Sequence, residues 1–307
     1  MSQARPIVSV VMPCYNQGKY VDEAVGSVLN QTFQSFEIIL INDGSTDEET
    51  NQILGNYQKP GVTVLHTENR GPAAARNTGI QYARGQYILP LDADDRIAPT
   101  YLEQAVRILD ENPNVGIVYC EAEFFGEKTG KFDLPGFNFP GILLGNMIFN
   151  SSFYRKADWE KVGGYKNDFR GWEDYDFWLS LIELGREVVR IPEVLYYYRQ
   201  INSSRSNSMT RQSWIEDYTH LFRNHTELYS QNISALFEHI IDLREDVQHT
   251  HARLNETLKL LFEADEQRQK AENQRQQAED QLRTIQNSRF GRLYNGYVKL
   301  KKLLGQS

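Results

Sequence analysis

Cysteine is scarce in this chain, and acidic residues outnumber basic ones. The 307 residues contain only Cys14 and Cys120, which excludes a disulfide framework. We expect two buried thiols in a reducing compartment. The 33 lysines and arginines stand against 41 acidic residues, and the net charge of −8 has the wrong sign for general attraction to nucleic acid. Any phosphate binding must therefore be local.

Long apolar runs are also missing. The chain has no uninterrupted stretch of 18 apolar residues, and its first residues lack the apolar core of a signal peptide. We therefore expect a cytoplasmic protein. The hydrophobic content of 40% is enough to supply a proper core, so we expect most of the chain to be globular.

The first hundred residues alternate short apolar runs with helical patterns. This rhythm is typical of βαβ units and predicts a mostly parallel sheet covered on both sides by helices. In such sheets, ligands bind beyond the carboxyl ends of the strands. The expected strands are Ile7–Met12, Phe36–Ile41, Val62–His66 and Gln86–Leu91, and the expected helices are Tyr20–Leu29, one opened by a capping box at Thr46–Glu49, and Pro72–Arg84.

Glycine and proline are absent between Ile233 and Gly291, and Glu, Gln, Arg and Ala dominate there. This composition predicts one long helix. Twelve of its sixteen heptad a and d positions, counted from Ile233 as a to Ile285 as d, are apolar, which favours a coiled coil and a homo-oligomer. A single solvated helix is the alternative, because Arg268 and Arg275 interrupt the seam.

The last twenty residues, 288–307, form a basic amphipathic segment without acidic residues. Such a segment is suited to the surface of an anionic membrane, where each cation contributes about 1 kcal/mol. A helix packed on the rest of the protein or on a partner is an equal alternative. The chain thus divides into an α/β domain (1–220), a helical extension (221–287) and this tail.

Carboxylates gather where the buried strand Gln86–Leu91 ends, at Asp92, Asp94 and Asp95. Clustered carboxylates raise one another's pKa unless a cation compensates them. Mg²⁺ and Mn²⁺ bind through one or two carboxylates together with substrate phosphates. The cluster alone is a weak signal, since a solvated turn or a helix cap has the same composition.

Two other strands end in polar residues. Asp43 closes the strand from Phe36, where its carboxylate could accept from the N–H of a base, while the neighbouring Ser45 and Asp47 fit a turn and a helix cap. The first strand ends in a proline turn that exposes an aromatic ring and an amide, at Pro13, Tyr15 and Asn16.

These segments together resemble glycosyltransferase family 2. The resemblance covers about residues 6 to 206. It implies a GT-A fold, a nucleoside-diphosphate sugar donor, a divalent metal and transfer with inversion at the anomeric carbon. The matching segments, in order, are 8–16 (VSVVMPCYN), 42–47 (NDGSTD), 69–79 (NRGPAAARNTG), 91–95 (LDADD), 162–165 (VGGY) and 171–178 (GWEDYDFW).

The resemblance also implies roles for single residues. Pro13, Tyr15 and Asn16 would line the nucleoside pocket, and Asp43 would accept from the base, with uracil favoured. Asp92 would contact the ribose or the metal site, and Asp94 would ligate Mn²⁺ or Mg²⁺. Arg76 matches an arginine of the family, for which a diphosphate contact and a packing salt bridge are both open.

An inverting displacement needs a base on the face opposite the leaving group. Glu173 and Asp174 are the candidates. The resemblance implies that Asp174 is the base and Glu173 a partner of the acceptor hydroxyl, whereas a helix N-cap is the alternative for Asp174. Trp172 could form an aromatic wall for a sugar ring or could pack in the core.

Two departures from the family pattern limit these implications. Many relatives have a metal-binding His where this chain has Ile201, which cannot ligate, so the third protein ligand stays open, with water or Gln200 as candidates. The Gln-x-x-Arg-Trp sequence of processive relatives is absent, because Gln212-Ser-Trp214 has the wrong spacing. We therefore expect one or a few sugars to be added to a glycan or lipid-linked acceptor of cell-surface polysaccharide synthesis, at the inner face of a membrane.

Two other classes of protein share some of these features. A nucleotidyltransferase would also combine a nucleotide, a metal and carboxylates, but it needs a basic glycine-rich loop near the N-terminus, where only Lys19 is found. A catalytically inactive scaffold around the coiled coil is disfavoured by the intact acidic residues and slightly favoured by Ile201. The sugar, the acceptor and the oligomeric state are not readable from the sequence.

Overall fold

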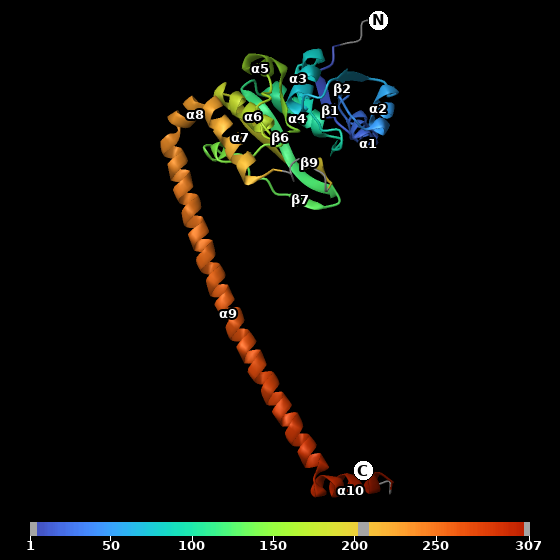
Figure 1. Cartoon of the computed structure of the whole chain (residues 1–307), viewed down its shortest axis with the longest axis vertical. Coiled ribbons are helices and arrows are strands. Elements are labelled where there is room, and N and C mark those ends of the chain that lie inside the picture. Colours follow the sequence, from blue (N-terminus) through green and yellow to red (C-terminus); the bar gives the residue numbers. More distant parts are fainter. Residues whose placement is uncertain (1–4, 202–208, 304–307) are drawn as a thin grey trace. The chain divides into compact units, whose positions relative to one another are not determined.

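The computed structural model describes residues 5–201 and 209–303. The chain forms two units, Met1–Phe237 and Glu238–Ser307. The first contains the whole sheet and the shorter helices, coloured from blue to orange in Figure 1. The second consists of the greater part of one long helix and a shorter helix after it.

The N-terminal half of the sheet is parallel. Strands β1 (Val8–Cys14), β2 (Phe36–Asp43), β3 (Val62–Thr67) and β4 (Tyr87–Pro90) lie in the order β3-β2-β1-β4. All residues of β1 and β4 are buried, as expected for strands covered on both faces. The connecting helices are α1 (Gly18–Leu29), α2 (Glu48–Gly55) and α3 (Pro72–Tyr82), which confirms the predicted alternation of strands and helices.

The predicted capping box at Thr46 is wrong by one residue. Asp47 is the N-cap of α2, because its Oδ2 accepts from the backbone N–H of Thr50 at 2.8 Å and from the Thr50 hydroxyl at 2.6 Å. Thr46 instead pairs with Asn16, which accepts from the Thr46 N–H and donates to its hydroxyl. Thr46, which the local pattern assigns to the helix cap, therefore forms hydrogen bonds with the loop at the end of β1 instead.

The second half makes the sheet mixed instead of mostly parallel. The strand β8 (Phe153–Arg155) pairs antiparallel with both β4 and β6 (Val115–Gly126), and β9 (Glu187–Gln200) then runs parallel to β6. Two short strands, β5 (Arg96–Ile97) and β7 (Gly130–Phe132), pair antiparallel with β9 and β6. The helices of this half are α4 (Tyr101–Glu111), the 3-10 turn η1 (Gly141–Leu143), α5 (Lys156–Val162) and α6 (Glu173–Glu183).

Two further helices belong to the first unit. They are α7 (Arg211–Asn224) and α8 (Thr226–Gln231), and the predicted boundary at residue 220 falls inside α7. Leu221 and Tyr229 from these helices, and Leu236 from the next, are buried in the same hydrophobic core as the sheet. The compact unit therefore extends to Phe237.

The second unit is helical over residues 238–303 except at Ser288, which lies between its two helices. Helix α9 (Ile233–Asn287) enters it from the first unit, and α10 (Arg289–Leu303) follows. The long helix predicted from Ile233 is thereby confirmed. Its apolar side chains beyond Phe237 are exposed, with 68% of Val247, 54% of Leu254 and 61% of Leu261 accessible. Within residues 5–201 and 209–303, no helix has the length and apolarity to cross a membrane.

Candidate active site

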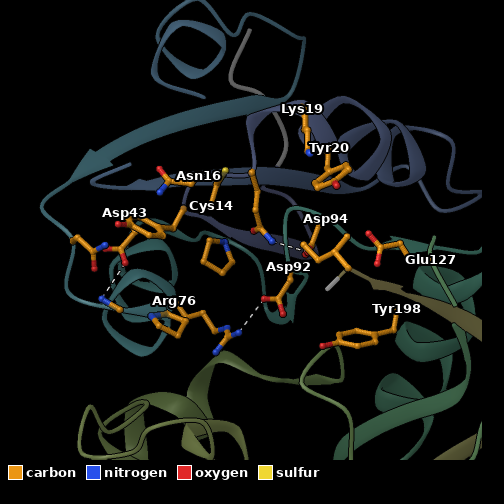
Figure 2. A pocket seen from close by; sticks show the side chains of 17 residues that line it. Cys14, Asn16, Lys19, Tyr20, Asp43, Arg76, Asp92, Asp94, Glu127 and Tyr198 are labelled. Atoms are coloured by element: carbon orange, nitrogen blue, oxygen red, sulfur yellow. Dashed lines mark hydrogen bonds and ion pairs between the residues drawn. The ribbon is translucent and has the colours of Figure 1, made fainter. Parts of the chain in front are cut away.

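A cavity of about 750 Å³ opens at the carboxyl ends of β1, β2 and β4. Figure 2 shows Asp92 and Asp94 pointing into it, with Asp43 toward one end and Glu127 and Tyr198 toward the other. The structure brings seven of the predicted site residues together here, although they come from four separate sequence segments. They are Pro13, Tyr15, Asn16, Asp43, Arg76, Asp92 and Asp94.

At one end of this cavity, backbone N–H groups fix Asp43. Its carboxylate accepts from the backbone N–H of Arg70 at 3.1 Å and of Gly71 at 3.0 Å, and the side chain is buried. The close turn at Gly71 has φ of 87°, which glycine adopts without strain. The Asp43 carboxylate is thus held in one place at the edge of the cavity.

The turn after β1 is held by hydrogen bonds at Asn16 and is exposed at Tyr15. Asn16 has φ of 55°, a conformation in which Asn is enriched, and its Oδ1 accepts from the N–H groups of Thr46 and Asp47. Tyr15 beside it is 43% exposed. An aromatic face is therefore available at the cavity while its backbone is anchored.

The three aspartates after β4 have different environments. Burial, and next the charge of Asp92, raise the pKa of Asp94 to about 7, although Arg199 opposes the change. Gln17 donates to Asp94 at 2.6 Å. Asp95 faces away from the cavity and accepts from the Tyr196 hydroxyl and from the Arg199 N–H, so its role is to anchor the loop.

Asp92 and Asp94 fit a divalent metal site that substrate would complete. Both side chains line the same cavity, and the pKa of Asp94 is raised by burial and by the charge of Asp92, an effect that a bound cation would offset. Within the part of the chain that the structure describes, no group of three or more His, Cys, Asp or Glu is arranged to hold a metal alone. Two carboxylates with substrate phosphates and water remain a suitable donor set for Mg²⁺ or Mn²⁺.

Ile201 occupies the position at which many relatives have a metal-binding histidine. Ile201 lines the cavity, and so does Glu127 from the turn after β6. The N–H of Glu127 donates to the Gln200 carbonyl at 3.0 Å, which keeps the two chain segments together. Gln200, an expected alternative ligand, lines a second cavity instead.

Arg76 separates the two cavities and lines both. Its guanidinium contacts Asp92 at 2.9 Å and Glu173 at 2.8 Å, and the side chain is 4% exposed. Of the two interpretations left open by the sequence, this is the geometry of the packing salt bridge. It links residues 97 apart in the chain and fixes the two acidic segments relative to each other.

The second cavity has a volume of about 480 Å³ and contains Trp172, Glu173 and Asp174. Asp174 lies in the first turn of α6, whose N-cap position is Trp172, so Asp174 is not the N-cap. Burial, and next the charge of Glu173, raise the pKa of Asp174 to about 7, while Arg76 opposes the change. Asn146 donates to the Asp174 Oδ2 at 3.3 Å.

Trp172 contacts other aromatic rings. Its ring centroid lies 4.5 Å from that of Tyr218 in an edge-on arrangement, and 6.5 Å from that of Trp214. Trp172 packs partly on the core and also lines the second cavity, so its core packing is confirmed and its contact with a sugar ring stays a prediction.

Sequence reasoning missed several residues of the two cavities. Gln17 and Glu127 lie outside the family's motifs. Trp214 belongs to a segment whose spacing does not match the Gln-x-x-Arg-Trp sequence, so no motif predicts a role for it. Tyr198, which lines both cavities, sits in a run of tyrosines on β9 that reads as an ordinary strand. No local pattern distinguishes these residues, because the contacts that place them are long-range.

The fold and the paired acidic sites define a GT-A glycosyltransferase, as predicted. The family model described as Glycosyl transferase family 2 matches residues 9–165. Glycosyltransferase GlyG of Streptococcus pneumoniae serotype 4 is 31% identical over 297 residues, which cover 85% of this chain and 98% of GlyG. The chain therefore belongs to glycosyltransferase family 2.

Another relative is a longer protein. Uncharacterized protein y4gI of Sinorhizobium fredii is 34% identical over 216 residues, but these are 67% of this chain and only 24% of y4gI. The chain thus spans about a quarter of that relative's length.

Solved structures support the fold. Residues 1–349 of S. aureus TarS, in complex with UDP-GlcNAc, align with a TM-score of 0.56 and 22% identity, over 74% of this chain and 72% of that one. The mannosyltransferase PcManGT of Pyrobaculum calidifontis, in complex with GDP-Man and Mn²⁺, aligns with a TM-score of 0.55 and 20% identity, over 74% and 65%. At these identities the similarity concerns the fold alone.

Proposed function

We propose that this protein is an inverting glycosyltransferase that moves a sugar from a nucleoside-diphosphate donor, with UDP favoured, to a glycan or lipid-linked acceptor of cell-surface polysaccharide synthesis. One observation carries the proposal. Two cavities meet at the ion pair of Arg76 and Asp92, with buried acidic groups on both sides. A donor and an acceptor could therefore meet at a charged boundary.

In the proposed reaction, Asp174 is the base. A carboxylate whose pKa is raised to about 7 can accept a proton at neutral pH and remain ionised before it does so. The acceptor oxygen attacks the anomeric carbon, the bond to the diphosphate breaks, and the hydroxyl proton passes to Asp174. Glu173 accepts a hydrogen bond from the acceptor and, through Arg76, is tied to the donor side.

The donor residues follow from the first cavity. Tyr15 offers its ring to the base, Pro13 and Asn16 shape the turn beneath it, and Asp43 accepts from a base N–H such as that of uracil. We assign Arg76 the role of positioning Asp92 and Glu173, since both sides of its guanidinium are engaged.

Asp94 and Asp92 would hold a divalent metal, with Mn²⁺ supported by the presence of that ion in the PcManGT complex. When bound, the metal neutralises charge on the departing diphosphate. Gln17 holds the Asp94 carboxylate in its orientation through the 2.6 Å hydrogen bond.

A panel of nucleotide sugars, with and without Mn²⁺, tests the proposal through binding and hydrolysis. We expect one donor to bind with metal, Asp94→Ala to lose that binding, and Asp174→Asn to keep binding and lose transfer. Binding of no nucleotide sugar under any metal condition would refute the proposed function.

In this proposal, the second unit is responsible for oligomerisation and for membrane contact. The exposed apolar a and d residues of α9 pair two or more copies, and the basic face of α10 contacts an anionic membrane. Four large apolar side chains of α10, at Leu293, Tyr294, Tyr297 and Leu300, are between 60% and 71% exposed. Sedimentation with vesicles that contain phosphatidylglycerol, but not with purely zwitterionic vesicles, is the expected result.

A further inference from the structure

We infer that Arg199 is a positioning residue for Asp94, and that its side chain sets the affinity of the proposed metal site by holding the loop that carries Asp94. This inference rests on the proposed function and deepens it at the metal site. Three kinds of contact made by the Arg199 side chain support it: a bond to a backbone carbonyl, contacts with two aromatic rings and an ion pair.

Arg199, on β9, binds the loop after β4 at two consecutive residues. Its side-chain Nε donates to the Asp94 carbonyl at 2.7 Å, and its backbone N–H donates to the Asp95 carboxylate at 2.7 Å. Gln17, the N-cap residue of α1, donates to the Asp94 carboxylate. Asp94 is therefore held at its side chain from α1 and at its backbone from β9. Bonds of this kind orient a metal ligand without touching the metal.

Two aromatic rings fix the Arg199 guanidinium. Its central carbon lies 4.4 Å from the ring centre of Tyr20 on α1 and 4.2 Å from that of Phe125 on β6. Phe125 is the residue paired with Arg199 in the register of β6 and β9, and Tyr20 lines the same cavity as Asp94 (Figure 2). Contacts with two rings restrict the orientation of a planar guanidinium. The Nε–H therefore stays directed at the Asp94 carbonyl.

The charge of Arg199 is offset by a carboxylate. Its Nη2 forms an ion pair with Glu23 of α1, which also contacts Arg96 at 3.3 Å. A cation beside a metal site weakens metal binding by repulsion, whereas a bond that orients a metal ligand strengthens it. Removal of the Arg199 side chain therefore has opposite effects on metal affinity in the two cases, and a measurement of that affinity distinguishes positioning from repulsion.

The test measures the Mn²⁺ Kd of the full chain from the electron paramagnetic resonance signal of free Mn²⁺, with the nucleoside diphosphate of the donor that the panel identifies. We expect Arg199→Met to raise this Kd about tenfold or more. Arg199→Lys should not restore the affinity, because an ammonium keeps the charge but lacks the Nε–H and the planar shape. An unchanged or lower Kd for Arg199→Met, or a wild-type Kd for Arg199→Lys, overturns the inference.

Arg96→Met is the matched control. Arg96 also contacts Glu23 and lies 4.5 Å from the ring centre of Phe125, so its loss removes one positive charge from the same cluster. The bond from Arg199 to the Asp94 carbonyl stays in place, and the Mn²⁺ Kd should remain within about twofold of the wild-type value. An equal rise in Kd for Arg96→Met overturns the inference, because the cause would then be general damage to the cluster.

A milder variant decides the outcome if Arg199→Met does not fold. Phe125→Leu keeps an apolar side chain of similar position but removes one of the two rings that orient the guanidinium. We expect its Mn²⁺ Kd to rise about two- to fivefold, in line with the strength of such a contact. An unchanged Kd for Phe125→Leu in that case overturns the inference. Absence of Mn²⁺ binding to the wild type with every nucleoside diphosphate would instead refute the metal dependence of the proposed function.

Discussion

At the scale of single residues, the proposed active site depends on two charged groups, the guanidinium of Arg76 and the carboxylate of Asp174. Arg76 contacts Asp92 and Glu173, while burial and the charge of Glu173 raise the pKa of Asp174 to about 7. The Arg76 cation offsets the charges of Asp92 and Glu173, and Asp174, with its raised pKa, is the proposed proton acceptor at neutral pH. Each makes its own prediction.

Loss of the Arg76 charge should destabilise the fold. Arg76→Met removes the cation that both carboxylates contact in a buried setting, and breaking such a pair from one side costs about 3–5 kcal/mol. Urea unfolding at pH 7.5 measures this change. Arg76→Lys should recover part of the loss, because a single ammonium keeps the charge but not the two-sided geometry. A cost below about 1 kcal/mol for Arg76→Met would contradict the role given to this ion pair.

Transfer should be lost as the pH falls through the pKa of Asp174. Burial and Glu173 raise that pKa to about 7, so below it the carboxyl is protonated and cannot accept the hydroxyl proton. For a single group with this pKa, the transfer rate should rise about tenfold between pH 6 and pH 8. The rate is measured at saturating donor and Mn²⁺, so that loss of donor binding does not contribute. A flat profile would exclude Asp174 as the base.

At the scale of elements, three tyrosines connect the last helices of the first unit to the acceptor side. Tyr175 of α6, Tyr229 of α8 and Tyr218 of α7 donate their hydroxyls to the consecutive carbonyls of residues 142, 143 and 144. This segment leads directly to Asn146, which bonds Asp174. The helices therefore position Asp174, the proposed base, through the segment around η1.

Removing one of these hydrogen bonds should raise the acceptor KM while lowering the free energy of unfolding only slightly. Tyr218→Phe loses the 2.6 Å bond to the Leu144 carbonyl, at a cost of about 0.5–1.5 kcal/mol in unfolding free energy. We expect a higher acceptor KM with nucleotide binding unchanged, because the donor cavity does not include α7. Tyr82→Phe, at an exposed tyrosine of α3, is the control. Equal loss of nucleotide affinity in Tyr218→Phe would show general damage to the fold.

The sequence predicts the first half of this architecture well and the second half poorly. β1 to β4 have local signals, since buried parallel strands are continuous apolar runs and the intervening helices have a clear 3.6-residue period. The antiparallel insertion of β8 and the pairing of β6 with β9 depend on contacts between distant segments. The acidic residues were found from their motifs, whereas Gln17, Tyr198 and Trp214 are placed by those distant contacts.

At the scale of the whole molecule, two kinds of surface are combined in one chain. The first unit buries its apolar residues in a single core around the sheet, and α9 exposes apolar residues along its length beyond Phe237. Exposed leucines at heptad spacing are unfavourable in water unless they pack against another helix. The second unit is therefore the part of the chain in which assembly is expected.

Substitutions on the seam of α9 should dissociate the assembly and spare the enzyme. We expect the wild-type chain to sediment as an oligomer, and Leu254→Glu with Leu261→Glu, both at a positions, to sediment as a monomer with normal donor hydrolysis. Charges at two buried seam positions each leave an unpaired carboxylate in the interface, which costs more than the lost apolar contact alone. Phe262→Glu is the matched control, because Phe262 is 73% exposed and lies at a b position beside Leu261, off the seam. A wild-type monomer at micromolar concentration, or an oligomer disrupted equally by Phe262→Glu, would show that the a and d residues do not form the interface.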